Sequence, residues 1–247
     1  MAHRIDHDSV LVERQRILTE FRRRDQDMAR GRYAVWHPAE MLMRDERRRL
    51  ATRMLQNVGG FPRRTDCCLE IGYGALGWLA DLVSWGVAAS QLHGIELNAA
   101  RAGLAQRALP GADLRVGDAA ELPWGNDRFR LVIASTVFSS ILEASVRKLV
   151  AREMTRVLAP GGAVLWYDLG VNNPRNPQVR KISRQELVAL FPDLRAEIRS
   201  VTLAPPIARW IAKRNWLLAC LASGVPILRT HLLAVLVKPG SAGSPMA

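Results

Sequence analysis

From residue 66 onward, short apolar runs alternate with longer segments in which apolar positions recur at helical spacing. This alternation is typical of α/β proteins built on a parallel sheet. The apolar runs predict strands near residues 66–71, 91–96, 112–116, 129–135, 162–168, 195–202 and 230–237. The segments between them predict helices near residues 76–86, 99–109, 143–158, 183–191 and 206–223.

The stretch before the first strand has a different pattern. Helical spacing over residues 10–24 and 39–58 predicts two helices, the second ending at Gly59-Gly60. We expect residues 1–60 to form a helical lid over the edge of the sheet, residues 61–239 the main domain, and residues 240–247 a disordered tail. Tyr33, Trp36 and His37 lie between the two helices, where either ligand contact or ordinary packing would suit them.

A glycine-rich turn follows the first predicted strand. Glu70 ends that strand, and Gly72, Gly74 and Gly77 come next. A dinucleotide-binding turn needs no acid on the incoming strand, and a carboxylate there would repel phosphate. Glu70 would instead suit a ligand with a positive end, such as an amino group. A tight turn without a ligand is the alternative.

Two more acids stand at the ends of later strands. Glu96 ends the second apolar run, where a carboxylate can accept hydrogen bonds from both ribose hydroxyls. Asp118 follows the third run, where it can accept from the amine of an adenine. Each acid alone suits a helix cap or a turn, but all three would line the ligand-binding edge of a parallel sheet.

With these motifs, the chain resembles the class I S-adenosylmethionine-dependent methyltransferases over residues 66–168. That family has a Rossmann-like, seven-stranded, mostly parallel sheet with helices on both faces and an antiparallel last strand. The resemblance implies S-adenosylmethionine as the cofactor. It implies that the following residues bind it: Glu70, Gly72, Tyr73, Gly74, Gly77, Glu96, Leu97, Asp118, Ala119 and Ser135. Arg130 is a departure, because the family usually has Asp there.

The segments after strands four and five suggest where a methyl acceptor binds. Strand four lacks the Asn/Asp-Pro-Pro-aromatic motif of enzymes that methylate nucleobases or protein glutamine. The loop after strand five resembles a bacterial, ubiquinone-methylase-like subgroup. The candidate substrate residues are Tyr33, Trp36, Thr136, Phe138, Tyr167, Asn172, Asn173 and Arg175. His37 and Asp168 are the candidate general bases, and proximity without a base is the alternative.

The net charge of +12 raises the question of whether the protein binds nucleic acid. Arginines cluster at residues 22–24, 47–49 and 63–64 without interleaved aromatics, so solvated helix faces explain the charge better than nucleic acid does. An anionic substrate or a peripheral contact with an anionic membrane also fits. The apolar segment 206–223, with Trp210 and Trp216, suits core packing or one wall of a hydrophobic acceptor pocket.

The remaining composition fits a protein of a reducing cytoplasm. The three cysteines have no metal-ligand spacing, so no metal is expected. The polar, charged start does not resemble a secretory signal. The uncharged run at residues 216–228 is too short to span a bilayer. The sequence is compatible with a monomer or a homodimer.

The favoured function is methyl transfer to a small molecule by in-line displacement. The expected acceptor atom is an oxygen of a partly hydrophobic natural product or of a lipid- or glycan-linked metabolite. Three alternatives stay open: an RNA or protein methyltransferase, a non-catalytic module with the same fold, and a nicotinamide-dependent dehydrogenase. Glu70 argues against the dehydrogenase.

Overall fold

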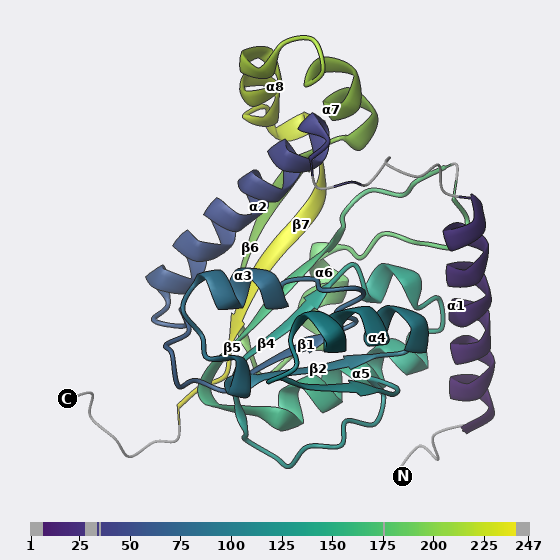
Figure 1. Cartoon of the computed structure of the whole chain (residues 1–247), viewed down its shortest axis with the longest axis vertical. Helices are drawn as coiled ribbons and strands as arrows, with labels where there is room; N and C mark the ends of the chain where they lie inside the picture. The colour runs from purple at the N-terminus through teal and green to yellow at the C-terminus, as the bar shows by residue number, and fades with distance from the viewer. Residues whose placement is uncertain (1–6, 28–33, 35, 175, 241–247) are drawn as a thin grey trace.

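The computed structural model describes residues 7–27, 34, 36–174 and 176–240, which build one seven-stranded sheet with helices on both faces (Figure 1). The strand order is β3-β2-β1-β4-β5-β7-β6. The strands are β1 Cys68–Ile71, β2 Leu92–Glu96, β3 Asp113–Val116, β4 Phe129–Ser135, β5 Leu158–Leu169, β6 Arg195–Leu203 and β7 Arg229–Val237. Strands β1 to β5 are parallel, and β7 is antiparallel to both β5 and β6. The predicted fold class is confirmed, including the antiparallel last strand.

The helices bury apolar side chains against both faces of the sheet. Their bounds are α1 His7–Asp27, α2 Pro38–Asn57, α3 Leu79–Ser84, α4 Ala99–Ala108, α5 Ala144–Val157, α6 Arg184–Leu190, α7 Pro205–Ile211 and α8 Trp216–Ser223. One core joins α5 and α6 to the sheet, and the other joins α2, α3 and α4. Polar side chains cap the helices: Asn98 accepts from the N–H of Ala100 and Arg101, and Ser183 accepts from Glu186 N–H.

The predicted helix over residues 206–223 is instead two helices, α7 and α8. The chain is extended at Asn215, whose side chain accepts a hydrogen bond from Leu218 N–H and so begins a new helix. Asn215, which follows Lys213 and Arg214, is therefore the local cause of the break. The expected tail falls almost entirely on residues 241–247, outside the described residues.

Arg130, the departure from the family pattern, has a structural role. Its guanidinium donates to the Gly161 carbonyl and, at 2.6 Å, to the Gly59 carbonyl. Gly59 lies in the turn after α2 and Gly161 near the start of β5, both at the opposite end of the strands from the glycine-rich turn. Arg130 therefore joins these two segments and lies outside the candidate site.

The two N-terminal helices occupy different places. Helix α1 stands beside the ends of the strands, near α4 and α5, and Arg101 of α4 lies over the ring of Phe21 at 4.5 Å (Figure 1). Helix α2 packs along β6, β7 and α7. Only α1 is thus in the position of a lid, and the division at residue 60 stays a prediction. Among the described residues, no helix combines the length and hydrophobicity needed to cross a membrane.

Candidate functional site

A cavity of about 590 Å³ opens where the carboxyl ends of β1 to β4 meet. This volume falls within the roughly 300–1,000 Å³ of small-molecule sites. The sequence-predicted residues that line it are Gly72, Gly74, Glu96, Leu97, Asp118, Ala119, Ser135, Thr136 and Asn173. The sheet therefore brings three separate sequence motifs to one space.

The glycine-rich turn is shaped by three left-handed residues. Gly72, Gly74 and Gly77 have φ of 66°, 58° and 51°. A Cβ at Gly72 would lie 2.8 Å from Val137 Cγ2, and one at Gly77 would meet the Glu70 carboxylate. A Cβ at Gly74 would meet nothing within 4 Å. Gly74 also lines the cavity, so this turn leaves open space where a ligand can approach the backbone closely.

Glu70 lies behind the turn, which corrects the role expected for it. Its two carboxylate oxygens accept from Trp78 N–H at 2.9 and 2.8 Å, and Oε2 also accepts from Leu79 N–H at 3.0 Å. Glu70 is buried and does not line the cavity. Burial raises the pKa of Glu70 to about 8, although these N–H groups oppose the shift. The side chain therefore holds the turn and the start of α3 together.

Glu96 is buried but does line the cavity. Its Oε2 accepts from Gly74 N–H and its Oε1 from Asn98 N–H, both at 2.8 Å. Each carboxylate oxygen has a second lone pair, so Glu96 can still accept two more hydrogen bonds. It thus holds the glycine-rich turn against the end of β2, and it can still accept hydrogen bonds from the two hydroxyls of a diol.

The next two cofactor-motif residues differ in position. Asp118 lines the cavity, and its Oδ1 accepts from Ala120 N–H at 2.9 Å. Tyr73 is buried away from the cavity, with its hydroxyl donating to the Arg115 carbonyl at 3.2 Å. Burial raises the pKa of Tyr73 to about 12, so it stays neutral at physiological pH. Tyr73 and Gly77 are therefore packing residues of the turn in this structure.

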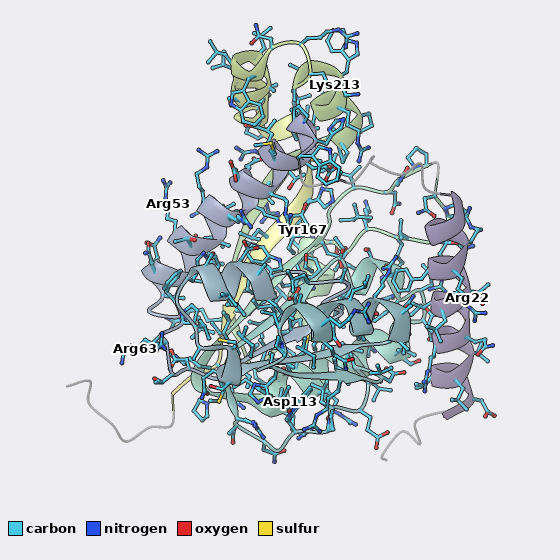
Figure 2. The ribbon with its side chains drawn as sticks, viewed as in Figure 1. Arg22, Arg53, Arg63, Asp113, Tyr167 and Lys213 are labelled. Atoms are coloured by element: carbon cyan, nitrogen blue, oxygen red, sulfur yellow. The ribbon has the colours of Figure 1, made fainter. Side chains whose placement is uncertain are left out.

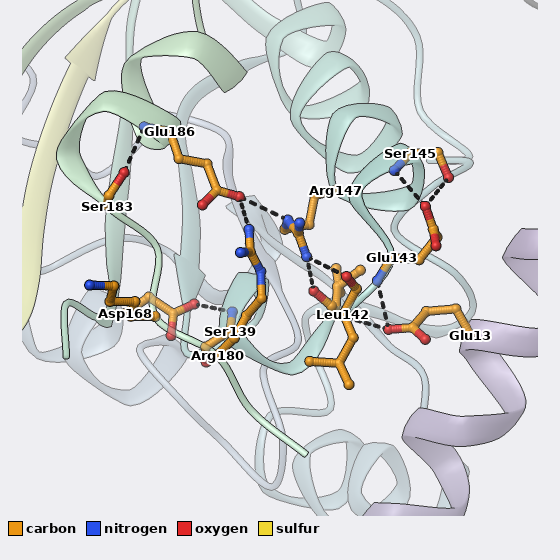
Figure 3. Close-up of polar contacts among 12 residues, drawn as sticks. Glu13, Ser139, Leu142, Glu143, Ser145, Arg147, Asp168, Arg180, Ser183 and Glu186 are labelled. Atoms are coloured by element: carbon orange, nitrogen blue, oxygen red, sulfur yellow. Dashed lines mark hydrogen bonds and ion pairs between the residues drawn. The ribbon is translucent and has the colours of Figure 1, made fainter. Parts of the chain in front are cut away.

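Neither candidate base lines the cavity, contrary to expectation. His37 is the N-cap of α2, where Nδ1 accepts from Ala39 N–H at 3.3 Å. Asp168 is fully buried, and its Oδ2 accepts from Ser139 N–H at 2.9 Å (Figure 3). Burial raises the pKa of Asp168 to about 6. Ser139 lines the cavity, as does Leu169, whose N–H donates to Asp168 Oδ1 at 2.8 Å, so Asp168 is linked to the site through these two residues.

Of the candidate substrate residues, Thr136 and Asn173 line the cavity. Thr136 has φ of 57°, an uncommon conformation for a β-branched residue. Its N–H donates to the Tyr167 carbonyl at 2.7 Å, and its hydroxyl donates to the Ser135 carbonyl at the same distance. The end of β4 is thereby held in a strained turn that faces the cavity.

The other candidate substrate residues lie elsewhere. Phe138 and Tyr167 are buried in the two cores, and Tyr167 shares a 2.9 Å hydrogen bond with Thr202. Asn172 accepts from Lys181 N–H at 2.8 Å, and Trp36 is 76% exposed outside the cavity. Tyr33 and Arg175 lie outside the described residues. The side chains of Phe138 and Tyr167 therefore belong to the core rather than to the wall of the cavity.

Sequence reasoning missed one wall of the cavity. It consists of residues from α1, from the segment after β4 and from α5, together with part of the loop after β5: Val10, Glu13, Arg14, Ile17, Phe21, Arg23, Ser140, Ile141, Val146, Val150, Asn176 and Val179. The helical spacing of Val10, Ile17 and Phe21 marks one face of α1, but it does not reveal what that face covers.

Helix α1 is fixed to this wall by polar contacts. Glu13 pairs with Arg16 at 2.8 Å and accepts from Leu142 N–H, in the segment after β4 (Figure 3). Arg16 also donates to the Ser140 carbonyl and to Gln178 Oε1, the latter at 3.0 Å. Charged side chains of α1 therefore form hydrogen bonds with backbone groups of a loop that borders the cavity, in place of water.

Comparison with known proteins agrees with this geometry. Residues 68–162 match the model of a methyltransferase domain. Over these residues the chain carries a methyltransferase domain. That domain indicates S-adenosylmethionine as the cofactor. None of the curated proteins matches the chain.

Solved structures share the fold of this methyltransferase domain at low sequence identity. A proposed sarcosine dimethylglycine methyltransferase from Galdieria sulphuraria is 14% identical, with a TM-score of 0.59, covering 78% of this chain and 85% of that one. The geranyl diphosphate C-methyltransferase of Streptomyces coelicolor A3(2), solved with Mg²⁺, geranyl diphosphate and S-adenosylhomocysteine, is 16% identical (TM-score 0.57, covering 78% and 77%). The [4+2]-cyclase SpnF is 15% identical (TM-score 0.56, covering 78% and 81%).

The residues present fit this cofactor. Gly74 leaves room for a ligand against the backbone, Glu96 retains acceptor capacity for ribose hydroxyls, and Asp118 lies at the next strand end along the cavity. Among the described residues, no group of His, Cys, Asp or Glu side chains is arranged to hold a metal ion.

Proposed function

We propose that this methyltransferase domain transfers the methyl group of S-adenosylmethionine to an oxygen of a small, partly hydrophobic molecule. The observation that supports this most directly is the composition of one cavity. Cofactor-motif residues form one side of it, and the other side includes apolar residues of α1 and α5 beside charged residues of α1. A cofactor and an apolar acceptor would then share a single space.

The cofactor would be held by the strand ends. Glu96 would accept the ribose hydroxyls, Asp118 would face the adenine, and Gly74 would let the chain approach the amino-acid end. The sulfonium of the cofactor supplies an activated methyl group. The protein's part is alignment, and positioning of this kind can be worth roughly 7–11 kcal/mol of the barrier.

Polar groups near the end of β4 would orient the acceptor. The Thr136 hydroxyl donates to Ser135, so its oxygen remains able to accept a hydrogen bond from an acceptor hydroxyl. Ser139 lines the cavity in front of Asp168. In this proposal Asp168 is a positioning residue that acts through Ser139, and no described histidine lines the cavity.

The net charge of +12 favours one other candidate, a methyltransferase of RNA. The end of β4 argues against it, since that segment lacks the motif of nucleobase-methylating enzymes. The similarity to SpnF, a [4+2]-cyclase, adds a reminder that this fold does not by itself specify methyl transfer.

A labelling experiment separates these possibilities. The purified protein is incubated with S-adenosylmethionine labelled in its methyl group and with three fractions: total RNA, total protein, and an organic extract of bacterial cells. We expect label in organic-extractable molecules, bound through an alkali-stable ether or an alkali-labile ester. Label in RNA or protein alone would contradict the proposal, and labelling of none of them would favour a non-methylating role.

A further inference from the structure

The segment between β6 and β7 carries an exposed apolar surface. Helices α7 and α8 and the 3-10 turn Pro226–Leu228 form a hairpin that stands away from the sheet (Figure 1). Its exposed apolar residues, called here the hairpin patch, are Trp210, Trp216, Leu217, Leu218, Leu221, Val225 and Ile227. Isolated exposed apolar residues are ordinary, but seven within 18 residues of chain indicate an interaction surface.

The hairpin packs alanines and, in part, Ile207, Ile211 and Leu228 inward, and it leaves its other large apolar side chains exposed. Ala208, Ala212 and Ala219 are buried against the start of α2 and the end of β6. Trp210 is 64% exposed and Ile227 is 89% exposed. A helix pair that only completed the core would bury its largest side chains. The exposed large side chains therefore indicate a binding surface rather than part of the core.

The charged side chains of the hairpin itself are all positive, and the nearby carboxylates Glu40 and Glu46 of α2 pair with Arg209 and Arg229. The chain has no Asp or Glu after Glu197, but it has Lys213 and Arg214 at the tip of the hairpin, where Lys213 is labelled in Figure 2. The Arg214 guanidinium lies over the ring of Trp210 at 5.1 Å. Among the described residues, no carboxylate forms an ion pair with Lys213 or Arg214. The patch thus combines apolar, indole and cationic groups.

The topology places this surface on the same side as the cavity. Strand β6 runs parallel to β5, because β7 is antiparallel to both. The hairpin follows the carboxyl end of β6, and the cavity lies at the carboxyl ends of β1 to β4. A surface that binds the hairpin would therefore face the edge of the sheet at which the cavity opens.

We propose that the hairpin patch docks on the surface of an anionic lipid bilayer. Indole rings favour the boundary between headgroups and acyl chains, aliphatic side chains insert just below it, and Lys and Arg pair with anionic headgroups. A second copy of this chain fits less well, since a symmetric contact would bring Lys213 and Arg214 against cations of the same kind. The inference does not rest on the proposed methyl transfer.

Vesicle co-sedimentation tests the proposal with the full chain. Vesicles of phosphatidylcholine alone are compared with vesicles that also contain phosphatidylglycerol. We expect binding to the anionic vesicles, weakening as salt rises. Each lost cation should lower the partition coefficient roughly fivefold, so K213Q/R214Q should lower it roughly 25-fold. L217S/L221S/I227S should abolish most binding, and the tryptophan emission of the wild type should shift to the blue with vesicles.

Matched controls keep the result interpretable. L104S/V188S removes two exposed apolar residues from α4 and α6, far from the hairpin in sequence, and should bind vesicles like the wild type. Far-ultraviolet circular dichroism confirms that each variant folds. Equal binding to neutral and anionic vesicles, equal binding by L217S/L221S/I227S, or a dimer in sedimentation velocity that this variant dissolves would each overturn the proposal.

Discussion

At the residue scale, Glu96 has two roles that a single substitution can test. It fixes Gly74 and Asn98 through their N–H groups, and it faces the cavity with remaining acceptor capacity. Glu96→Ala should weaken S-adenosylmethionine binding by roughly 1.5–3 kcal/mol for each charge-assisted hydrogen bond lost. Calorimetric titration measures this loss. Glu121→Ala, which removes an exposed acid near β3, should bind normally. An unchanged affinity in folded Glu96→Ala would refute the ribose assignment.

Gly74 permits a test with a closely matched control. Gly74 and Gly59 have φ of 58° and 64°, and a Cβ at either would meet nothing within 4 Å. Alanine at either position should therefore cost about 1–2 kcal/mol of stability, from the left-handed backbone alone. Only Gly74 lines the cavity, so only Gly74→Ala should lose cofactor affinity. Thermal melts and titrations of both variants measure the two effects, and equal affinity in both would remove Gly74 from the site.

Single residues also show the limit of sequence reasoning. Glu70, Glu96 and Asp118 could be predicted at three strand ends, because apolar runs mark where parallel strands stop. The sequence could not reveal that Glu70 turns behind the glycine-rich turn while the other two face the cavity. That difference depends on three backbone N–H contacts that form only when α3 is in place.

At the element scale, pairing between β5 and β7 creates a buried, titratable stack. The rings of Tyr167 and His231 are parallel, with centroids 5.0 Å apart. Burial, with the Arg47 charge adding to it, lowers the pKa of His231 from its ordinary 6.5 to about 4. His231 therefore contributes stability that is present above pH 6.5 and is lost as pH falls through about 4.

His231→Phe keeps an aromatic ring in the stack but removes the titration. Urea unfolding of both proteins at pH 7 and near pH 4 measures the effect. The wild type should lose on the order of 3 kcal/mol more than the variant over this interval, from a shift of about 2.5 pKa units. Other buried groups such as Asp168 titrate in both proteins and cancel in the comparison. Parallel losses would contradict the assignment of this stability to His231.

The bounds of the helices were easier to predict than the elements against which the helices pack. The spacing of apolar residues predicted α1 and α2 to within a few residues, but it assigned both to a lid. In the structure, α2 packs on the sheet and α1 borders the cavity. An apolar stripe shows that a helix has a buried face, whereas its partner depends on chain crossings that have no local signal.

At the scale of the whole molecule, the mostly parallel sheet could be predicted from the alternation of strands and helices, whereas the cavity could not. The strands and their parallel arrangement were predictable because each apolar run is short and bounded by turns. The wall opposite the cofactor motifs combines α1, α5 and the loop after β5, which are far apart in sequence. Its mixture of apolar and charged residues, on which the proposal of a partly hydrophobic acceptor rests, appears only when these elements assemble.

The central claim is that the cavity at the strand ends binds S-adenosylmethionine. Calorimetric titration of the full chain with S-adenosylmethionine, S-adenosylhomocysteine and NAD in parallel tests it most directly. The geometry of Glu96, Asp118 and Gly74 predicts saturable one-to-one binding of the first two ligands, and the match to a methyltransferase domain predicts no binding of NAD. Binding of NAD alone would contradict the claim and favour a nicotinamide-dependent enzyme.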